Sequence, residues 1–288
     1  MLLSGKARLA GVMGWPVGHS LSPRLHGHWI ARHGLDAAYV PLPTRPEDVE
    51  TAFRLLPRLG FLGWNVTLPH KEAAFRLVDG HDVSALRTGS VNTVLVDAEG
   101  RTRGHSTDGE GFLANLRHQA PDWRAPAGPT ALIGTGGAAR AVAVALLDAG
   151  APSLRLANRT PARALELAQA LRSLFPGAAV GTVAWEERAA ALDGAALCVN
   201  CSSLGMHGQP PLDLALDALP PESPVADLVY VPLETPLLRA ARQRGHPAVD
   251  GLGMLVRQAV PGFRHWGGIE PTVDAATSAV LLEALARR

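Results

Sequence analysis

Lys71 is an unusual residue for this chain, because its basic side chains are almost all arginines. Of the 27 lysines and arginines among 288 residues, only Lys6 and Lys71 are lysine. Arginine keeps its proton in a protein, whereas the amine of a lysine can release one. Lys71 ends the segment 65–71 (NVTLPHK), in which an apolar stretch leads through polar side chains into a helix signal. The pattern therefore predicts a proton-transferring amine at Lys71. We assign no such role to Lys6, which lies in an N-terminal segment that is expected to be exposed.

A glycine-rich turn follows the apolar stretch 130–133 and opens an alanine-rich stretch. Glycines let the backbone turn tightly and approach a diphosphate, whose charge is met by the amides at the start of the next helix. Alanine at the third glycine position of this fingerprint still allows helix and strand to pack. We expect a dinucleotide-binding turn made by Gly134, Thr135, Gly136, Gly137, Ala138 and Ala139.

The next apolar strand candidate ends in basic and polar residues. It runs into Asn158, Arg159 and Thr160, and Arg163 follows one helical turn later. A carboxylate here would favour the ribose hydroxyls of NAD, whereas guanidinium groups suit the 2′-phosphate of NADP. NADP is the expected cofactor; the alternative is that these arginines are solvated charges that open a helix.

Two cysteines and several histidines also have to be assigned. Cys198 and Cys201 have the spacing of a redox dithiol, but they follow an apolar strand-like run and do not open a helix. We expect both to be structural. His19, His70 and His105 lie beside the polar motifs, yet no pair has a recognised metal-ligand spacing, so no metal site is expected.

The composition indicates a folded chain without an electrostatic signature for large anionic partners. Of the 288 residues, 47% are hydrophobic and 18% are charged, and the formal net charge is +1. Such a balance offers no broad basic surface to nucleic acid or an anionic membrane. No apolar run could span a bilayer, and no secretion signal opens the sequence. We therefore expect a cytoplasmic protein of two domains that binds neither nucleic acid nor membrane.

Hydrophobic patterning places the motifs on alternating strands and helices. A capping box at Thr44 to Glu47 predicts a helix start, and Thr67 is expected to cap the helix that contains Lys71. Prolines at 121–129 suggest a linker. The expected strands are 7–13, 37–42, 62–66, the hairpin 92–97 and 102–105, and then 130–133, 154–157, 195–199 and 225–229. The expected helices are 23–33, 108–119, an alanine-rich helix that follows the glycine turn and ends at 149, and the last forty residues. In the second half strands alternate with helices, which predicts a parallel sheet covered on both faces.

Many motifs, in a fixed order along nearly the whole chain, resemble the shikimate dehydrogenase family. They are 14–23 (GWPVGHSLSP), 65–71 (NVTLPHK), 89–93 (GSVNT), 107–111 (TDGEG), 134–139, 158–160, 200–206, 227–236 and 251–258. So many motifs in the family's own order make the resemblance very specific. On these residues the chain is similar to NADP-dependent oxidoreductases that act on a CH–OH group.

The resemblance implies reversible oxidation of shikimate to 3-dehydroshikimate in the pathway to the aromatic amino acids. It makes Lys71 the general acid and base and Asp108 its partner. It assigns the substrate carboxylate to Ser20, Ser22 and Tyr230, the ring hydroxyls to Asn65, Thr67, Asn92, Asp108 and Gln258, and the border of the nicotinamide to Leu228 and Gly251. A monomer or a homodimer is expected, with a small-molecule substrate and no metal.

The same resemblance implies two α/β domains with a cleft between them. The substrate-binding catalytic domain is expected at 1–107, completed by C-terminal helices at 252–288 that fold back onto it. A Rossmann-like, doubly wound NADP domain is expected at 108–251, including a connecting helix.

Three departures and three alternatives accompany this interpretation. Ser106 stands where the family usually has asparagine, and Cys201 replaces a common alanine. Pro261 falls inside an expected helix, where it is expected to kink the chain near Gln258. One alternative is a quinate and shikimate dehydrogenase of broader range, which prefers quinate and uses NAD or either cofactor. Another is a non-catalytic regulator, whose mark would be a broken Lys71 or Asp108, and both are present. A related folate-pathway dehydrogenase would not need the serine pair.

Overall fold

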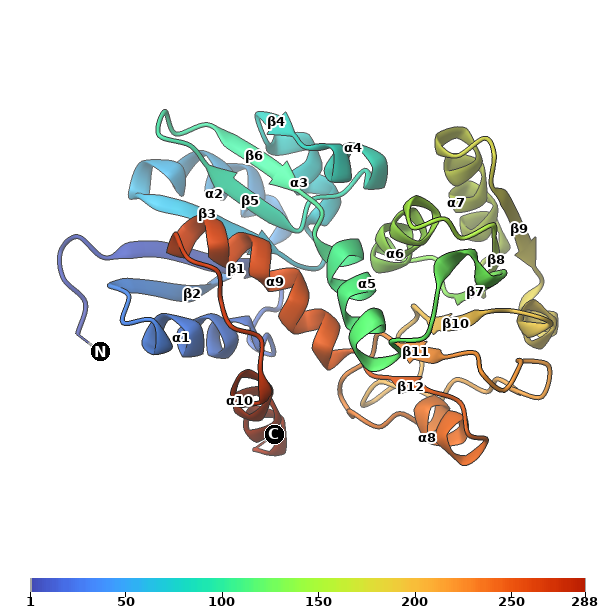
Figure 1. Cartoon of the computed structure of the whole chain (residues 1–288). Coiled ribbons are helices and arrows are strands. Elements are labelled where there is room, and N and C mark those ends of the chain that lie inside the picture. Colours follow the sequence, from blue (N-terminus) through green and yellow to red (C-terminus); the bar gives the residue numbers. More distant parts are fainter. Residues whose placement is uncertain (1, 288) are drawn as a thin grey trace. The chain divides into compact units, whose positions relative to one another are not determined.

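The chain forms two compact units, each built around its own sheet. The computed structural model describes residues 2–287. Unit 1 runs up to Thr107 and resumes at Gln258, and unit 2 spans Asp108–Arg257. Each unit combines helices with a six-stranded sheet (Figure 1). The α/β fold class expected from the sequence is confirmed.

The sheet of unit 1 is mixed. Its strands are β1 (Arg8–Gly14), β2 (Ala37–Pro43), β3 (Phe61–Val66), β4 (Gly80–His81), β5 (Thr93–Val96) and β6 (Thr102–His105). They are ordered β2-β1-β3-β5-β6-β4. The strand β1 pairs in parallel with β2 and β3, whereas β3–β5 and β5–β6 are antiparallel pairs. The pair β5–β6 is the predicted hairpin, and it brings the segments before β5 and after β6 to the same end of the sheet, where β3 also ends.

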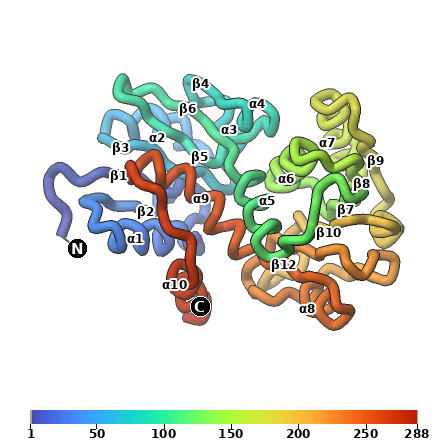
Figure 2. The backbone as a smooth tube through the Cα atoms, in the orientation of Figure 1, coloured from blue at the N-terminus to red at the C-terminus, as the bar shows by residue number. Residues whose placement is uncertain are grey.

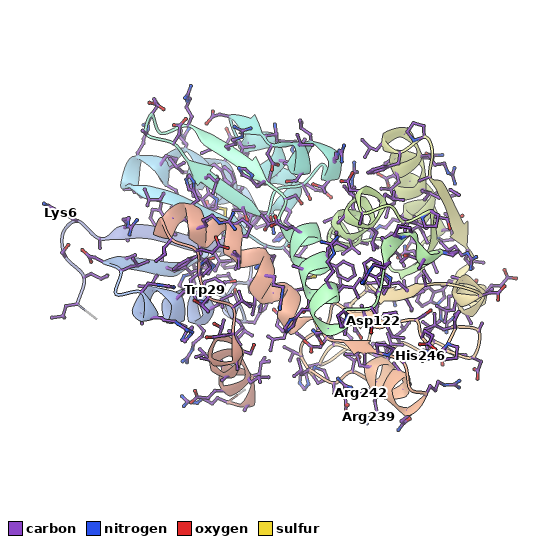
Figure 3. All side chains as sticks on the ribbon, viewed as in Figure 1. Lys6, Trp29, Asp122, Arg239, Arg242 and His246 are labelled. Carbon is purple, nitrogen blue, oxygen red and sulfur yellow. The ribbon has the colours of Figure 1, made fainter. Side chains whose placement is uncertain are left out.

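Helices of unit 1 bury large aromatic side chains. They are α1 (Ser22–Arg32), α2 (Val49–Leu55), α3 (Lys71–Leu77), α4 (Val83–Thr88), the end of α9 (Leu252–Gly267) and α10 (Ala275–Ala286), with 3₁₀ turns η1 (Pro46–Asp48) and η2 (Pro57–Leu59). Trp64 of β3 is fully buried and meets Phe53 edge to face at 5.1 Å. Trp29 of α1, labelled in Figure 3, packs on Phe263 of α9 at 5.1 Å between ring centroids. Its indole nitrogen donates to the Thr272 carbonyl. The end of the chain is thus anchored on α1, and α10 also packs there (Figure 2).

Unit 2 has a wholly parallel sheet. Its strands are β7 (Thr130–Ile133), β8 (Ser153–Ala157), β9 (Ala179–Val183), β10 (Leu197–Asn200), β11 (Val225–Asp227) and β12 (Ala248–Val249). The order is β12-β11-β10-β7-β8-β9, so the chain winds outward from β7 in one direction and then returns to build β10 on its other side. This reversal beside β7 is where doubly wound sheets hold their ligands. The predicted Rossmann-like arrangement is confirmed.

Residues of β7 face two separate cores, because helices cover both faces of this sheet. The helices are α5 (Asp108–Gln119), α6 (Gly137–Asp148), α7 (Pro161–Leu174) and α8 (Pro236–Gln243), with η3 (Ala125–Ala127) and η4 (Trp185–Leu192). Leu132 packs into one core with residues of α5, α6 and α7. Its neighbours Ala131 and Ile133 pack into the other with residues of η4 and α8. Two-sided burial explains why the strand is a continuous apolar run.

Two predicted helix caps and the predicted linker were wrong. The Thr44 hydroxyl donates back to the Leu42 carbonyl at 3.1 Å, a local bond that competes with capping, and the helical segment starts as η1. Thr67 lies in a turn in which its carbonyl accepts from the His70 amide, and α3 begins only at Lys71. The proline-rich stretch 121–129 lies within unit 2, where Trp123 is buried. The sequence pattern also missed β4, β9 and β12, which are short or partly exposed.

Gly63 offers a test of the packing in unit 1. A Cβ atom there would lie 2.1 Å from the Val94 carbonyl oxygen and 2.3 Å from Nε1 of Trp266, at a φ of +149°. Gly63→Ala should therefore lower the free energy of unfolding by about 3 kcal/mol or more, as measured by urea denaturation. Gly27→Ala, in α1 with no atom near the added carbon, is the control and should be neutral or stabilising. Equal stability of the two variants would contradict this packing.

Candidate active site

Asn65 and Asn92 meet at the end of β3. The Asn65 side-chain amide donates to the Asn92 carbonyl at 3.2 Å and to Oγ1 of Thr93 at 3.0 Å. The same Asn92 carbonyl accepts from the Val66 amide at 2.8 Å, and the Asn92 amide donates to the His105 carbonyl. Both asparagines are buried. Main-chain bonds of the sheet therefore hold two of the predicted substrate-binding residues side by side.

Gln258 joins this pair through Thr107. Nδ2 of Asn92 donates to Oγ1 of Thr107 at 3.0 Å and to Oε1 of Gln258 at 3.3 Å. The Thr107 hydroxyl donates to the Gln258 carbonyl at 2.8 Å. The helix α9 continues through Pro261, so the proline does not displace Gln258 from the network. The predicted residues Asn65, Asn92 and Gln258 are thus brought together within unit 1.

Sequence reasoning missed Tyr39, which links the serine motif to Asn65. Its hydroxyl donates to Oδ1 of Asn65 at 2.6 Å. Burial raises the pKa of Tyr39, and a hydrogen bond from Ser22 acts in the opposite direction. Ser22 is the buried first residue of α1, and its amide donates to Oγ of the half-buried Ser20. A signal existed: Tyr39 is one of only two tyrosines, and a tyrosine inside a strand needs a partner for its hydroxyl.

Lys71 and Thr67 flank the same end of the sheet. Lys71 is the half-buried first residue of α3, and its carbonyl accepts from the Val91 amide at 3.1 Å. Val91 directly precedes Asn92, so this bond ties the start of α3 to the asparagine network. Thr67, also half-buried, donates its amide to the Met13 carbonyl at 2.8 Å. His70 is a packing residue, because its ring bonds to the Thr44 carbonyl at 2.7 Å.

The glycine turn of unit 2 leaves open space beside main-chain amides. Gly134 has a φ of +97°, and a Cβ there would lie 2.8 Å from the Ser202 amide nitrogen. Gly136 and Gly137, in contrast, face open space, and the amides that begin α6 have no side-chain cap. The Thr135 hydroxyl and Nε of Arg140 are buried without a hydrogen-bond partner within residues 2–287. Open space, uncapped amides and unpaired donors fit an anionic cofactor group.

The polar end of β8 lies next to this turn, since the Gly134 amide donates to the Ala157 carbonyl at 2.8 Å. Asn158 follows, and its side chain donates to the Thr160 carbonyl at 2.9 Å, which shapes the segment. Arg159 and Arg163 are exposed, and neither forms an ion pair with a carboxylate of the described chain. Their guanidinium groups are therefore available to an anion.

A buried carboxylate, Asp227, organises the segment that follows β11. Its oxygens accept from the Asn200 side chain at 2.9 Å, from the Val229 amide at 3.0 Å and from the Thr235 hydroxyl at 2.7 Å. Burial outweighs these bonds and raises the pKa of Asp227 to about 6. The half-buried Tyr230 lies in the segment that these bonds hold.

Leu228 and Gly251 are in contact, as a shared role at the cofactor would require. A Cβ on Gly251 would lie 2.4 Å from the Leu228 carbonyl oxygen, so only glycine fits there. Asp108 is the buried first residue of α5, at the positive end of that helix. Sequence reasoning placed these residues by motif alone.

The two cysteines do not form a redox site. Cys198 lies in β10 and both thiols are free. Burial raises the pKa of Cys198 to about 12 and raises that of Cys201 further, which disfavours the reactive thiolates. Among residues 2–287 there is no group of three metal-ligating side chains, and no helix there is long and apolar enough to cross a membrane.

A doubly wound sheet with a glycine turn and a basic segment after its first two strands defines a dinucleotide-binding unit. Joined in one chain to a unit that carries a lysine beside a network of amides and hydroxyls, it defines a dinucleotide-dependent oxidoreductase of the α/β class.

Comparisons with known proteins identify the family. The model of the shikimate dehydrogenase substrate binding domain matches residues 12–94. A shikimate dehydrogenase (NADP(+)) of Rhodospirillum rubrum is 55% identical over 281 residues, which cover 98% of this chain and 99% of the relative. This chain belongs to the shikimate dehydrogenase family.

Two solved structures match this chain over nearly its whole length. Shikimate 5-dehydrogenase from Thermus thermophilus, in complex with NADP(H) and shikimate, has a TM-score of 0.82 and 37% identity, covering 97% of this chain and 99% of that one. Quinate dehydrogenase from Corynebacterium glutamicum, in complex with NAD, has a TM-score of 0.90 and 32% identity, covering 96% and 99%.

Asp227 should make stability depend on pH. Its folded pKa of about 6 lies above its ordinary value of 3.8, so the folded state binds more protons between these values. The free energy of unfolding should therefore fall as pH rises from about 4 to 7, by up to about 3 kcal/mol from this group. In Asp227→Asn this decrease should be absent in urea titrations at several pH values.

The exposed Asp217 is the control for this prediction. Its pKa is lowered by Arg244, so the sign of its contribution is opposite, and Asp217→Asn should keep the decrease due to Asp227. An identical pH profile in Asp227→Asn and the unmodified protein would contradict the assignment.

Proposed function

We propose that this protein catalyses the reversible NADP-dependent oxidation of shikimate to 3-dehydroshikimate. The observation that carries the proposal is the network of Asn65, Asn92 and Gln258 beside Lys71, in a chain that matches a named shikimate dehydrogenase (NADP(+)) over 98% of its length. Amides and hydroxyls suit a small polyhydroxylated ring, and a lysine suits the proton of its reacting hydroxyl.

Lys71 is proposed as the general acid and base. In oxidation its neutral amine accepts the hydroxyl proton as the C–O bond gains double-bond character, and in reduction its ammonium returns that proton to the oxygen. Asp108 is proposed to orient the amine and the hydroxyl. Ser20, Ser22 and Tyr230 are proposed to bind the carboxylate, and Asn65, Thr67, Asn92 and Gln258 the ring hydroxyls.

The cofactor is assigned to unit 2. Residues 134–139 would hold the diphosphate with main-chain amides, Asn158–Thr160 and Arg163 the adenosine 2′-phosphate, and Leu228 with Gly251 would border the nicotinamide. When bound there, NADP would supply the acceptor for the hydride of the alcohol carbon. The residues of the chain supply the other functions: they bind, orient and move the proton.

The remaining expectations belong to this proposal. The substrate-binding domain is proposed to comprise 1–107 with 252–288, and the NADP domain 108–251. The second compact unit ends slightly later, at Arg257 inside α9. A cytoplasmic location is supported by the two free cysteines. The protein is proposed to act as a monomer or a homodimer.

Lys71→Ala tests the proton-transfer role. Loss of the amine should lower kcat by about a hundredfold or more, because general acid–base groups contribute on that scale, and NADP affinity should stay unchanged. Turnover is measured as NADPH formation with shikimate, and affinity by calorimetry. Lys6→Ala is the matched control, since Lys6 is the other lysine and lies in the exposed N-terminal segment (Figure 3). Near-normal turnover of Lys71→Ala would refute the role.

One observation favours a second candidate, a broader shikimate and quinate dehydrogenase. The structure of the quinate dehydrogenase from Corynebacterium glutamicum, in complex with NAD, matches with a TM-score of 0.90. The exposed arginines after β8 favour NADP instead, since they suit a phosphate.

Arg159→Ala separates the two cofactor assignments. Without the guanidinium, kcat/KM with NADP should fall by about tenfold or more, whereas kcat/KM with NAD should change little. Assays use shikimate and quinate with each cofactor. Arg117→Ala, an exposed arginine of α5, is the control. An equal loss with both cofactors would contradict recognition of the 2′-phosphate, and comparable turnover of quinate would establish the broader activity.

A further inference from the structure

The Tyr39 hydroxyl is a fixed hydrogen-bond donor. The side chain is buried, and its hydroxyl lies 2.6 Å from Oδ1 of Asn65. Burial raises the pKa of Tyr39 well above its usual range, so the hydroxyl keeps its proton at physiological pH. An amide oxygen can only accept, so the direction of this bond is determined: Tyr39 donates.

The Asn65 amide has one possible orientation. Its partner on the other side is the Asn92 carbonyl at 3.2 Å, which can only accept, so Nδ2 must face it. The second N–H of Nδ2 points to Oγ1 of Thr93 at 3.0 Å. Both donor hydrogens are thereby used. What is left for a ligand is the second lone pair of Oδ1, the atom that Tyr39 holds.

Aromatic packing keeps the Tyr39 ring in place. The His26 ring stacks on it at 3.8 Å with an interplanar angle of 1°, and Trp266 lies 5.9 Å away. His26 is fully buried, and burial lowers its pKa to about 3, so the stacked imidazole is neutral. A cavity of about 20 Å³ borders all three rings. The hydroxyl therefore approaches Asn65 from a fixed ring.

We propose that Tyr39 is a positioning residue that fixes Asn65 as a hydrogen-bond acceptor for the substrate. This rests on the proposed function, in which Asn65 binds a ring hydroxyl. An acceptor selects a group that donates, so Asn65 distinguishes a hydroxyl from a carbonyl. The reacting hydroxyl becomes a carbonyl, which cannot donate. A contact that holds substrate and product alike needs a hydroxyl that the ketone product keeps, and Asn65 is assigned to such a hydroxyl.

A double-mutant cycle tests this role. The dissociation constants of shikimate and 3-dehydroshikimate are measured by calorimetry for the unmodified protein, Tyr39→Phe, Asn65→Ala and the double variant. Tyr39→Phe should weaken both ligands by about the same factor, roughly fivefold to tenfold, because a preorganised acceptor is lost. In the Asn65→Ala background the same substitution should change affinity by less than about twofold. In a Ser22→Ala background it should keep its effect.

His26→Phe is the matched control. It alters the same aromatic cluster, has the adjacent cavity to accommodate the larger ring and leaves the Tyr39 hydroxyl intact. Its shikimate affinity should stay unchanged. Hydrogen exchange of the Asn65 side-chain amide, followed by NMR without any ligand, gives a second measurement: it should be faster in Tyr39→Phe than in His26→Phe.

Several results would overturn the proposal. One is unchanged affinity in Tyr39→Phe; another is an equal loss with and without Asn65, which would mean a general structural effect. A loss confined to shikimate would refute the retained hydroxyl. If the unmodified protein neither bound nor oxidised shikimate, the proposed function would fail instead, and equal amide exchange in Tyr39→Phe and His26→Phe would then reject the Tyr39 contact on its own.

Discussion

The main chain of Asn92 is the junction on which the substrate-binding end of unit 1 depends. Its carbonyl accepts from the Val66 amide and from the Asn65 side chain, and its amide donates to the His105 carbonyl. One residue thus joins β3, the start of β5 and the end of β6. Because these bonds belong to the sheet itself, Asn65 and Asn92 are held on regular structure, which favours precise recognition of a small ligand.

The proposed cofactor site of unit 2 has a different requirement, because an anion must approach the backbone closely there. Gly134 is forced by a left-handed φ and by the nearby Ser202 amide, whereas Gly136 and Gly137 are not required by contacts within the chain. Their openness fits the proposed site for the cofactor diphosphate. Burial of the Asp227 carboxylate has a cost in free energy, because its hydrogen bonds compensate the lost hydration only in part. The same bonds hold the segment that bears Tyr230. Such local costs are typical of functional sites.

The departures from the family pattern have modest structural consequences. The Ser106 hydroxyl is buried without a hydrogen-bond partner in the described part of the chain, as expected where a longer polar side chain is usual. Its amide still donates to Oγ of Ser84, so the backbone before Thr107 remains anchored. Pro261 lies in α9 three residues beyond Gln258, and the Gln258 carbonyl accepts from the Thr107 hydroxyl.

The sequence by itself determined the fold class and the glycine turn, because both depend on local chemistry: strand and helix periodicity and left-handed glycine conformations. The contrast between lysine and arginine also made Lys71 the candidate for proton transfer. The helix-capping rules failed at Thr44 and Thr67. The Thr44 hydroxyl and the Thr67 carbonyl form other local hydrogen bonds, and neither residue caps a helix. Only the tertiary structure decided the hydrogen bonds of Tyr39 and Asn65. Tyr39 finds its partner Asn65 26 residues away on another strand, and the orientation of the Asn65 amide is fixed only when Asn92 and Thr93 are in place.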